Sequence, residues 1–127
     1  RLFPFIAFVL FFLWSCSGGN GHSHWEITTN FSLTEAQDGC TFYAGTGLYF
    51  RVVLNEEGEA EGCWDLSYYN SANLSVVSSR RELTEEGTVK VWIFRTEEPG
   101  ESWIGLDYWS PSSELPEKSV RYHVIVD

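Results

Sequence analysis

The sequence predicts an all-β domain, and three observations lead to this fold class. From His24 onward, apolar and polar residues alternate, which is the period of half-buried strands. The alternating runs are rich in Val, Ile, Thr, Tyr, Phe and Trp and are separated by Gly, Asn, Pro or Glu clusters, as strands and turns are. No window of twelve residues keeps a helical period. A chain of 127 residues has room for one ordinary domain, which we expect over 24–127.

The first expected element, residues 1–15, lies outside this domain and has the order of a secretory signal. Arg1 precedes an apolar run of 13 residues, Leu2 to Trp14, which is shorter than the roughly 20 residues that a membrane-spanning helix needs. Leu13-Trp14-Ser15-Cys16 then resembles the lipobox of bacterial lipoproteins. The resemblance implies cleavage before Cys16, diacylglycerol on its sulfur and a fatty acyl chain such as palmitate on the new N-terminus.

Residues 16–23 are expected to form the lipidated cysteine and a flexible tether. Ser17-Gly18-Gly19-Asn20-Gly21 is rich in glycine, as flexible linkers are. In lipoproteins of bacteria with two membranes, Asp after the cysteine favours retention at the inner membrane, whereas this chain has Ser17. The resemblance therefore implies a lipid-anchored protein of the bacterial envelope, held at the outer membrane.

Eight strands are expected in the domain itself. Their ranges are 24–31, 39–44, 47–54, 62–69, 73–79, 88–95, 102–109 and 119–126. Two Ser-x-x-Glu sequences, Ser32–Glu35 and Ser79–Glu82, have the spacing of a capping box. Each can begin one turn of helix in a connection.

Two pairs of consecutive strands match as hairpins. Residues 88–95 and 102–109 can pair as antiparallel strands in the register in which the numbers of two facing residues sum to 197. In this register Lys90 faces Asp107, and apolar residues face one another. Residues 48–54 and 62–68 fit in the same way with a sum of 116. A shift of one residue would place apolar side chains opposite charges, so the pattern favours these registers.

Two hairpins among eight short strands favour an antiparallel β-sandwich. About 110 residues is also the usual size of an immunoglobulin-like sandwich. The alternative is a small meander β-barrel.

The three cysteines leave one pair if Cys16 carries lipid. The envelope is an oxidising compartment, so we expect a Cys40–Cys63 disulfide. Its loop of about 24 residues would contribute about 3 kcal/mol in the chain-entropy model.

The formal net charge of −10 argues against a nucleic-acid partner, because phosphate backbones attract Lys and Arg. Glutamates gather at 56–61, 82–86 and 97–101. None of these segments has the alternating Asp/Asn pattern of a calcium loop, so we expect them to keep the protein soluble and its sheet edges unpaired.

Neither a metal site nor an enzyme site is expected. His22, His24 and Glu26 alternate along the chain, but they follow a glycine tether that offers no supporting residues for a metal. There is no Gly-x-Ser-x-Gly sequence, and no pair of carboxylates stands out for acid–base work. The sequence therefore predicts a non-catalytic protein without a cofactor.

Aromatic residues are the most suggestive candidates for binding. In the register that sums to 197, one face of the hairpin carries Trp92, Phe94, Trp103 and Trp109. This face either fills the core or forms an exposed platform, and large exposed apolar patches usually mark binding. The function expected is an interaction module for a protein or glycan partner, and the alternative is a small barrel that carries an apolar ligand.

Overall fold

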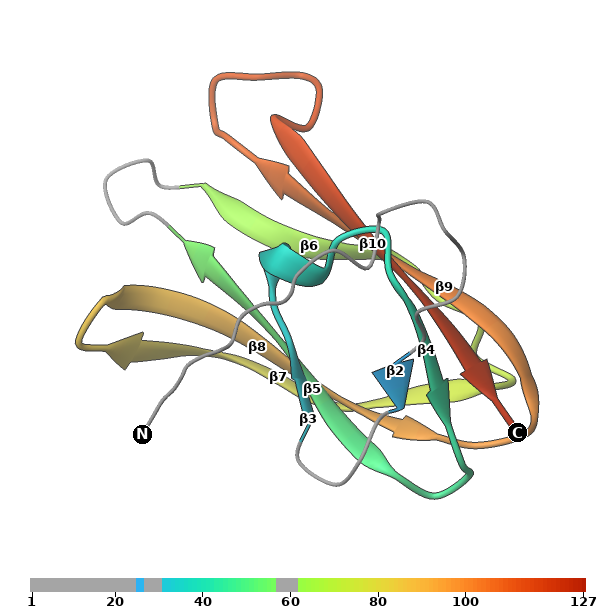
Figure 1. The fold of residues 1–127 in the computed structure, drawn as a ribbon. Helices are drawn as coiled ribbons and strands as arrows, with labels where there is room; N and C mark the ends of the chain where they lie inside the picture. The colour runs from blue at the N-terminus through green and yellow to red at the C-terminus, as the bar shows by residue number, and fades with distance from the viewer. Residues whose placement is uncertain (1–24, 27–30, 57–61) are drawn as a thin grey trace.

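A computed structural model describes residues 25–26, 31–56 and 62–127, which form a sandwich of two β-sheets (Figure 1). One sheet has five strands, in the spatial order β2 (Trp25–Glu26), β4 (Thr41–Ala44), β10 (Lys118–Val126), β9 (Gly100–Trp109) and β6 (Cys63–Tyr68). The other sheet has four strands, in the order β3 (Phe31–Leu33), β5 (Tyr49–Glu56), β8 (Gly87–Thr96) and β7 (Leu74–Thr84).

This architecture confirms the predicted all-β, immunoglobulin-like sandwich. In the described part of the chain the two sheets do not join into a closed barrel, so the meander barrel is excluded. The sheets are mixed and not purely antiparallel. Strand β4 runs parallel to β10 and to β2, and β3 runs parallel to β5.

The one helical turn in the described part of the chain is η1 (Glu35–Gln37), whose capping residue lies two positions after Ser32 of the first expected box. Thr34 caps it, because Thr34 Oγ1 accepts a bond from Ala36 N and Gln37 Oε1 accepts one from Thr34 N. The second box, Ser79–Glu82, lies inside β7, and that helical expectation is wrong because β7 pairs along its length with β8. Among the described residues, no helix has the length and hydropathy needed to cross a membrane.

Both predicted hairpins are wrong. Strand β8 pairs with β5 and β7, whereas β9 pairs with β10 and β6. The chain therefore crosses from one sheet to the other after β5 and after β8, as it also does after β3, β4 and β6. Inward-facing residues of β8 and β9 are both even-numbered, as Phe94 and Ile104 show. An odd register sum such as 197 cannot place even-numbered residues opposite one another.

The hairpins that do form are β7–β8 and β9–β10. The first turns tightly between Thr84 and its partner Gly87, which has a φ of +125°, a backbone conformation that favours glycine. The second is closed by the pair of Tyr108 with Lys118 and carries a longer loop over 110–117. In Figure 1 the β7–β8 turn lies at the left and the β9–β10 loop at the top, whereas the C-terminus lies at the lower right.

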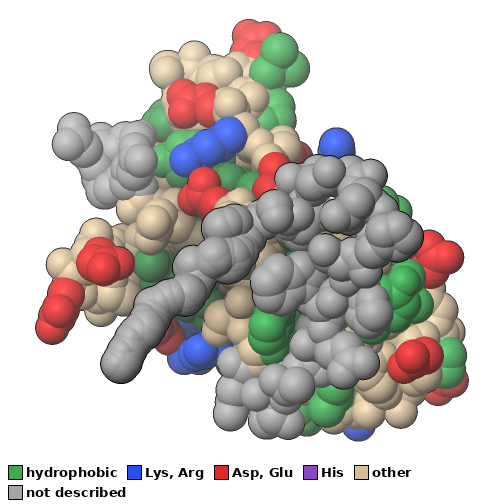
Figure 2. Space-filling view, in the orientation of Figure 1, with side chains coloured by type: hydrophobic (Ala, Val, Ile, Leu, Met, Phe, Trp, Pro, Cys, Tyr) green, Lys and Arg blue, Asp and Glu red, His purple; other side chains and the backbone are tan. Residues whose placement is uncertain are grey.

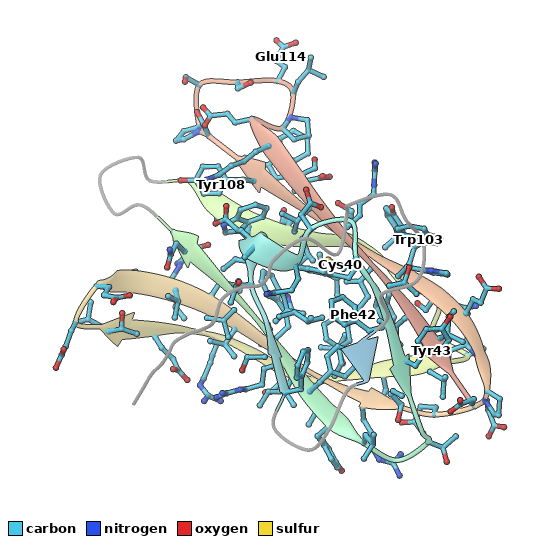
Figure 3. The ribbon with its side chains drawn as sticks, in the orientation of Figure 1. Cys40, Phe42, Tyr43, Trp103, Tyr108 and Glu114 are labelled. Atoms are coloured by element: carbon cyan, nitrogen blue, oxygen red, sulfur yellow. The ribbon has the colours of Figure 1, made fainter. Side chains whose placement is uncertain are left out.

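The core fills the space between the sheets. Figure 3 shows Phe42 in this space, and its ring is packed edge-on against Tyr122. Phe50 and Phe94 stack on the opposite sheet with ring centroids 5.4 Å apart. The largest fully buried side chains come from both sheets: Trp64, Tyr122, Phe42, Phe50, Phe94, Leu33, Leu54, Leu74, Ile104 and Leu106.

A buried carboxylate anchors the crossover between β5 and β6. The side chain of Glu56, at the end of β5, is 3% exposed. Its Oε2 accepts a bond from Trp64 N in β6 at 2.9 Å, and its Oε1 accepts one from Arg81 Nε in β7 at 2.5 Å. Glu56 was expected in a solvated acidic tip, and it instead ties together strands of both sheets.

Two buried polar residues anchor the crossover between β8 and β9. Asn73 Nδ2 donates to the carbonyl oxygens of Glu98 and Pro99 at 2.9 and 3.1 Å. Thr96 Oγ1 donates to Gly45 O at 2.6 Å and accepts from Leu48 N at 2.9 Å. These bonds satisfy backbone groups that no strand partner reaches at the point where the chain changes sheets.

The predicted Cys40–Cys63 disulfide is wrong, because Cys63 carries a free thiol. Cys40 lies beside β10, where its carbonyl oxygen accepts a bond from His123 N. Two strands, β10 and β9, separate it from β6. Three strand spacings amount to roughly 14 Å, about twice the largest Cα separation that a disulfide spans. Cys16 lies outside the described residues.

We expect Glu56→Ala to lower the free energy of unfolding by about 1–3 kcal/mol, because Trp64 N would lose its acceptor in a buried place. Urea denaturation measures this loss. Glu98→Ala is the matched control, since Glu98 is exposed in a turn and its removal should cost less than about 0.5 kcal/mol. Equal losses for the two variants would show that the crossover does not depend on Glu56.

Candidate functional site

The four aromatic residues expected on one face lie in three different environments, so that expectation is wrong. Trp92 is 3% exposed and Phe94 is fully buried, both in the four-stranded sheet. Trp103 is 45% exposed on the other sheet, and Trp109 is half-buried at the end of β9. Of this set, only Trp103 offers a substantially exposed ring.

Trp103 is held rigidly on the outer side of the five-stranded sheet (Figure 3). Its indole stacks on the ring of His123, with centroids 4.5 Å apart and an interplanar angle of 16°. His123 Nε2 lies 2.8 Å from Glu101 Oε1, and Nδ1 lies 3.2 Å from Thr41 Oγ1. The stack therefore fixes an exposed indole beside an exposed carboxylate.

Tyr68 extends this surface along β9. Its ring occupies the space that a side chain at position 105 would need, so any larger residue than Gly105 would displace the ring. Together Tyr68, Glu101, Trp103 and His123 form the surface that we call the Trp103 face.

Next to the Trp103 face, a carboxylate links three strands. Asp107 accepts bonds from Ser119 Oγ at 2.6 Å and Ser67 Oγ at 2.5 Å. These bonds hold the pKa of Asp107 below its usual range, against the opposing effect of burial. The carboxylate stays charged, but its hydrogen-bonding capacity is used to join β6, β9 and β10.

A second candidate surface lies at the far end of β9, where the two hairpins project. Leu83 in β7 is 85% exposed, and Leu115 in the β9–β10 loop is 73% exposed. Arg81 and Leu83 are two residues apart in β7, so their side chains lie on the same face of the sheet. This is the inner face, because Arg81 bonds to Glu56 between the sheets. Leu83 is nevertheless exposed because it lies beyond the end of the core. We call 83–86 and 113–117 the hairpin tips.

The hairpin tips are acidic as well as apolar. Exposed carboxylates at Glu85, Glu86, Glu114 and Glu117 accompany the two leucines, and Figure 2 shows acidic side chains at both projecting ends. None of these four forms an ion pair within the described ranges. A leucine surrounded by unpaired carboxylates is suited to an apolar depression with a basic rim on another protein.

An open groove of about 910 Å³ reaches the β7–β8 tip. Its apolar floor consists of Val53, Val89 and Val91, which share one face of the sheet because Val53 pairs with Val91 and Asn55 with Val89. Its walls come from η1, the β7–β8 tip and Lys118. We call this the tip groove.

The two cations that line the tip groove are already engaged. Lys118 Nζ lies 3.9 Å from Glu35 Oε1 and sits over the rings of Trp64 and Tyr108. Arg51 donates to Ser32 Oγ at 2.9 Å. The carboxylates of the lining therefore determine its electrostatic character.

Sequence reasoning missed the hairpin tips. The glutamates at 82–86 were expected only to keep the protein soluble. The available signal was a single large apolar residue in an otherwise polar segment, as in Leu83 and Leu115. No group of three metal-ligating side chains occurs in the described chain, and His22 and His24 lie outside it.

We expect Trp92→Ala to lower the free energy of unfolding by about 3–5 kcal/mol, as loss of a buried ring does. Trp103→Ala should cost only about 0.5–1.5 kcal/mol, since it removes one ring stack on a half-exposed side chain. Thermal and urea unfolding of both variants test this difference. A loss for Trp103→Ala as large as that for Trp92→Ala would remove the Trp103 face from the candidate surfaces.

No protein-family model and no curated protein matches this sequence, but solved structures are similar to it. The cysteine protease inhibitor EhICP2 from Entamoeba histolytica has a TM-score of 0.68 and 17% identity, covering 84% of this chain and all of its own. Amebosin has a TM-score of 0.64 and 20% identity, covering 77% of this chain and 98% of its own. PbICP-C, solved in complex with falcipain-2, has a TM-score of 0.59 and 14% identity, covering 82% of this chain and 98% of its own. At these identities the likeness shows that this chain shares the β-sandwich fold of the three proteins.

Proposed function

We propose that the domain is a non-catalytic protein-binding module that inhibits a cysteine protease through its hairpin tips. The observation that carries this proposal is the pair of exposed leucines, Leu83 on the β7–β8 hairpin and Leu115 on the β9–β10 hairpin. Large apolar side chains at such positions add nothing to the core, so they are free to contact a partner. EhICP2 is a cysteine protease inhibitor, which supports the choice of partner.

The sheet gives the β7–β8 tip a defined shape before binding. Strands β7 and β8 pair from Leu74–Thr96 to Thr84–Gly87, and Arg81 is tied to the buried Glu56 just before the tip. A preorganised contact surface loses little conformational entropy on binding. A preorganised β7–β8 tip can therefore occupy a protease cleft and exclude its substrate by steric blockage.

The interior favours an interaction module over a carrier of an apolar ligand. Side chains from both sheets fill the space between them, and the tip groove is open and rimmed by charges. A carrier needs a largely enclosed apolar cavity.

The lipid anchor is part of the same proposal. The lipobox-like Leu13-Trp14-Ser15-Cys16 supports an inhibitor tethered at the envelope of a bacterium, at the outer membrane. A tether followed by a binding domain would hold the hairpin tips where an incoming or resident protease meets the membrane.

We expect the purified protein to inhibit a papain-type cysteine protease competitively, with a Ki that rises about tenfold or more in Leu83→Ala/Leu115→Ala. The rise follows from losing two apolar anchors, each of which contributes on the order of 1 kcal/mol or more at an interface. Residual cleavage of a fluorogenic peptide measures Ki. Thermal unfolding should show that the variant is as stable as the wild type, because both leucines are exposed.

Trp103→Ala is the control for this experiment, since the Trp103 face lies away from the hairpin tips. Its Ki should stay within about twofold of the wild type. A tenfold rise in this variant alone would move the contact to the Trp103 face, and no inhibition of any papain-type protease by the wild type would end the proposed function.

We expect mass spectrometry of the mature protein, expressed in a bacterium with a lipoprotein pathway, to find an acylated Cys16 as the first residue. Cys16→Ala should abolish the added acyl mass and release the protein from the membrane fraction. An intact Leu2–Trp14 segment, or cleavage at another position, would contradict the lipid anchor and leave the inhibitor proposal standing.

A further inference from the structure

The tip groove has the dimensions of a peptide site. On β5 its lining extends from Arg51 to Asn55, which corresponds to about 13 Å of strand. This length accommodates about four residues of an extended chain. Its volume of about 910 Å³ falls within the range of ligand sites.

The floor and walls of the groove select the side chains that such a peptide would carry. Val53 is half-buried and offers an aliphatic surface to the methylene stem of a long side chain, whereas Val89 and Val91 beneath it are 7% and 3% exposed. Carboxylates in the lining outnumber cations, with Glu35, Glu82, Glu85 and Glu86 against Arg51 and Lys118. Glu35 is near Lys118, and Glu82 is paired with Arg80, whereas Glu85 and Glu86 form no ion pair within the described ranges.

We propose that the tip groove binds an extended segment of the partner protein that carries Lys or Arg side chains. The stem of one basic side chain lies on Val53, and its charged end reaches Glu85 and Glu86. The net charge of −10 adds a favourable long-range field for such a segment. This inference rests on the proposed function only in taking the partner to be a protein.

The experiment measures binding of two fluorescein-labelled six-residue peptides to the full chain by fluorescence anisotropy. One peptide has two Lys residues in an Ala and Val background, and the other has Glu at the same two places. We expect the lysine peptide to bind at least tenfold more tightly than the glutamate peptide. Its affinity should fall as the salt concentration rises from 50 to about 500 mM, as for any charge-based contact.

Variants at the wall and the floor locate the site. Glu85→Lys/Glu86→Lys should lower the affinity for the lysine peptide at least tenfold. Val53→Trp should lower it to the same extent by filling the groove without changing its charge. The matched control is Asp65→Lys/Glu98→Lys, which makes an equal change of charge at exposed residues outside the lining. It should alter the affinity less than threefold.

Several outcomes would overturn this inference. Equal binding of the two peptides, or equal effects of the groove and control variants, would show that the groove does not select basic segments. A dimer of this chain that Glu85→Lys/Glu86→Lys dissociates would identify a second copy as the occupant instead.

Protease inhibition separates this inference from the proposed function. If the wild type inhibits a protease and Glu85→Lys/Glu86→Lys inhibits it equally without binding the lysine peptide, the groove inference fails and the proposed function stands. If no protease is inhibited but the lysine peptide binds as expected, the groove inference stands and the proposed function fails.

Discussion

The buried carboxylate of Glu56 is the interaction on which the arrangement of the two sheets depends. Burying a charge costs several kcal/mol unless partners compensate it, and here the backbone of Trp64 and the guanidinium of Arg81 do so. These partners belong to β6 in one sheet and β7 in the other. A single side chain at the end of β5 thus sets where β6 starts and how β7 continues toward its tip. The position of the candidate site relative to the core follows from this arrangement.

The β5–β6 crossover is closed without a disulfide, although Cys63 lies beside it with a free thiol. Cys63 begins β6 next to Trp64, whose backbone already bonds to Glu56, and Trp64 Nε1 donates to Asn55 O at 2.8 Å. Hydrogen bonds from one tryptophan to two consecutive residues of β5 close the crossover. At the β8–β9 crossover, Asn73 and Thr96 serve the same purpose with neutral groups. The β5–β6 connection and the β8–β9 connection are therefore both closed by buried polar contacts.

Periodicity predicted the strands well, because burial on one face imposes alternation wherever a strand lies. Strand pairing could not be predicted in the same way. Alternation has a period of two, so many pairs of strands match in some register, and the matches of 88–95 with 102–109 and of 48–54 with 62–68 carried no information about which strands are neighbours. The same reasoning placed Trp103 with Phe94, although their strands belong to different sheets. Local turn chemistry, such as glycine at position 87, was the better guide to a true hairpin.

The candidate site was beyond prediction for a different reason. Leu83 continues the alternation of β7, and nothing in the local pattern indicates that the opposing sheet ends before reaching it. Its exposure is a property of the lengths of strands far apart in the sequence. The burial of polar residues could not be predicted for the same reason. The local sequence places Glu56 in an acidic turn, and its partners, Trp64 and Arg81, come close only in the folded crossover.

The separation of the hairpin tips from the core has an evolutionary consequence. Residues 83–86 and 113–117 make few contacts that stabilise the sandwich, so substitutions there escape the selection for foldability that restricts Glu56, Asn73 or Trp64. Mutations can accumulate at these positions and alter partner preference while the melting temperature stays constant. A lineage under pressure from a changing target would diversify its tips quickly and its interior slowly, which would yield paralogues of similar shape and little residue identity.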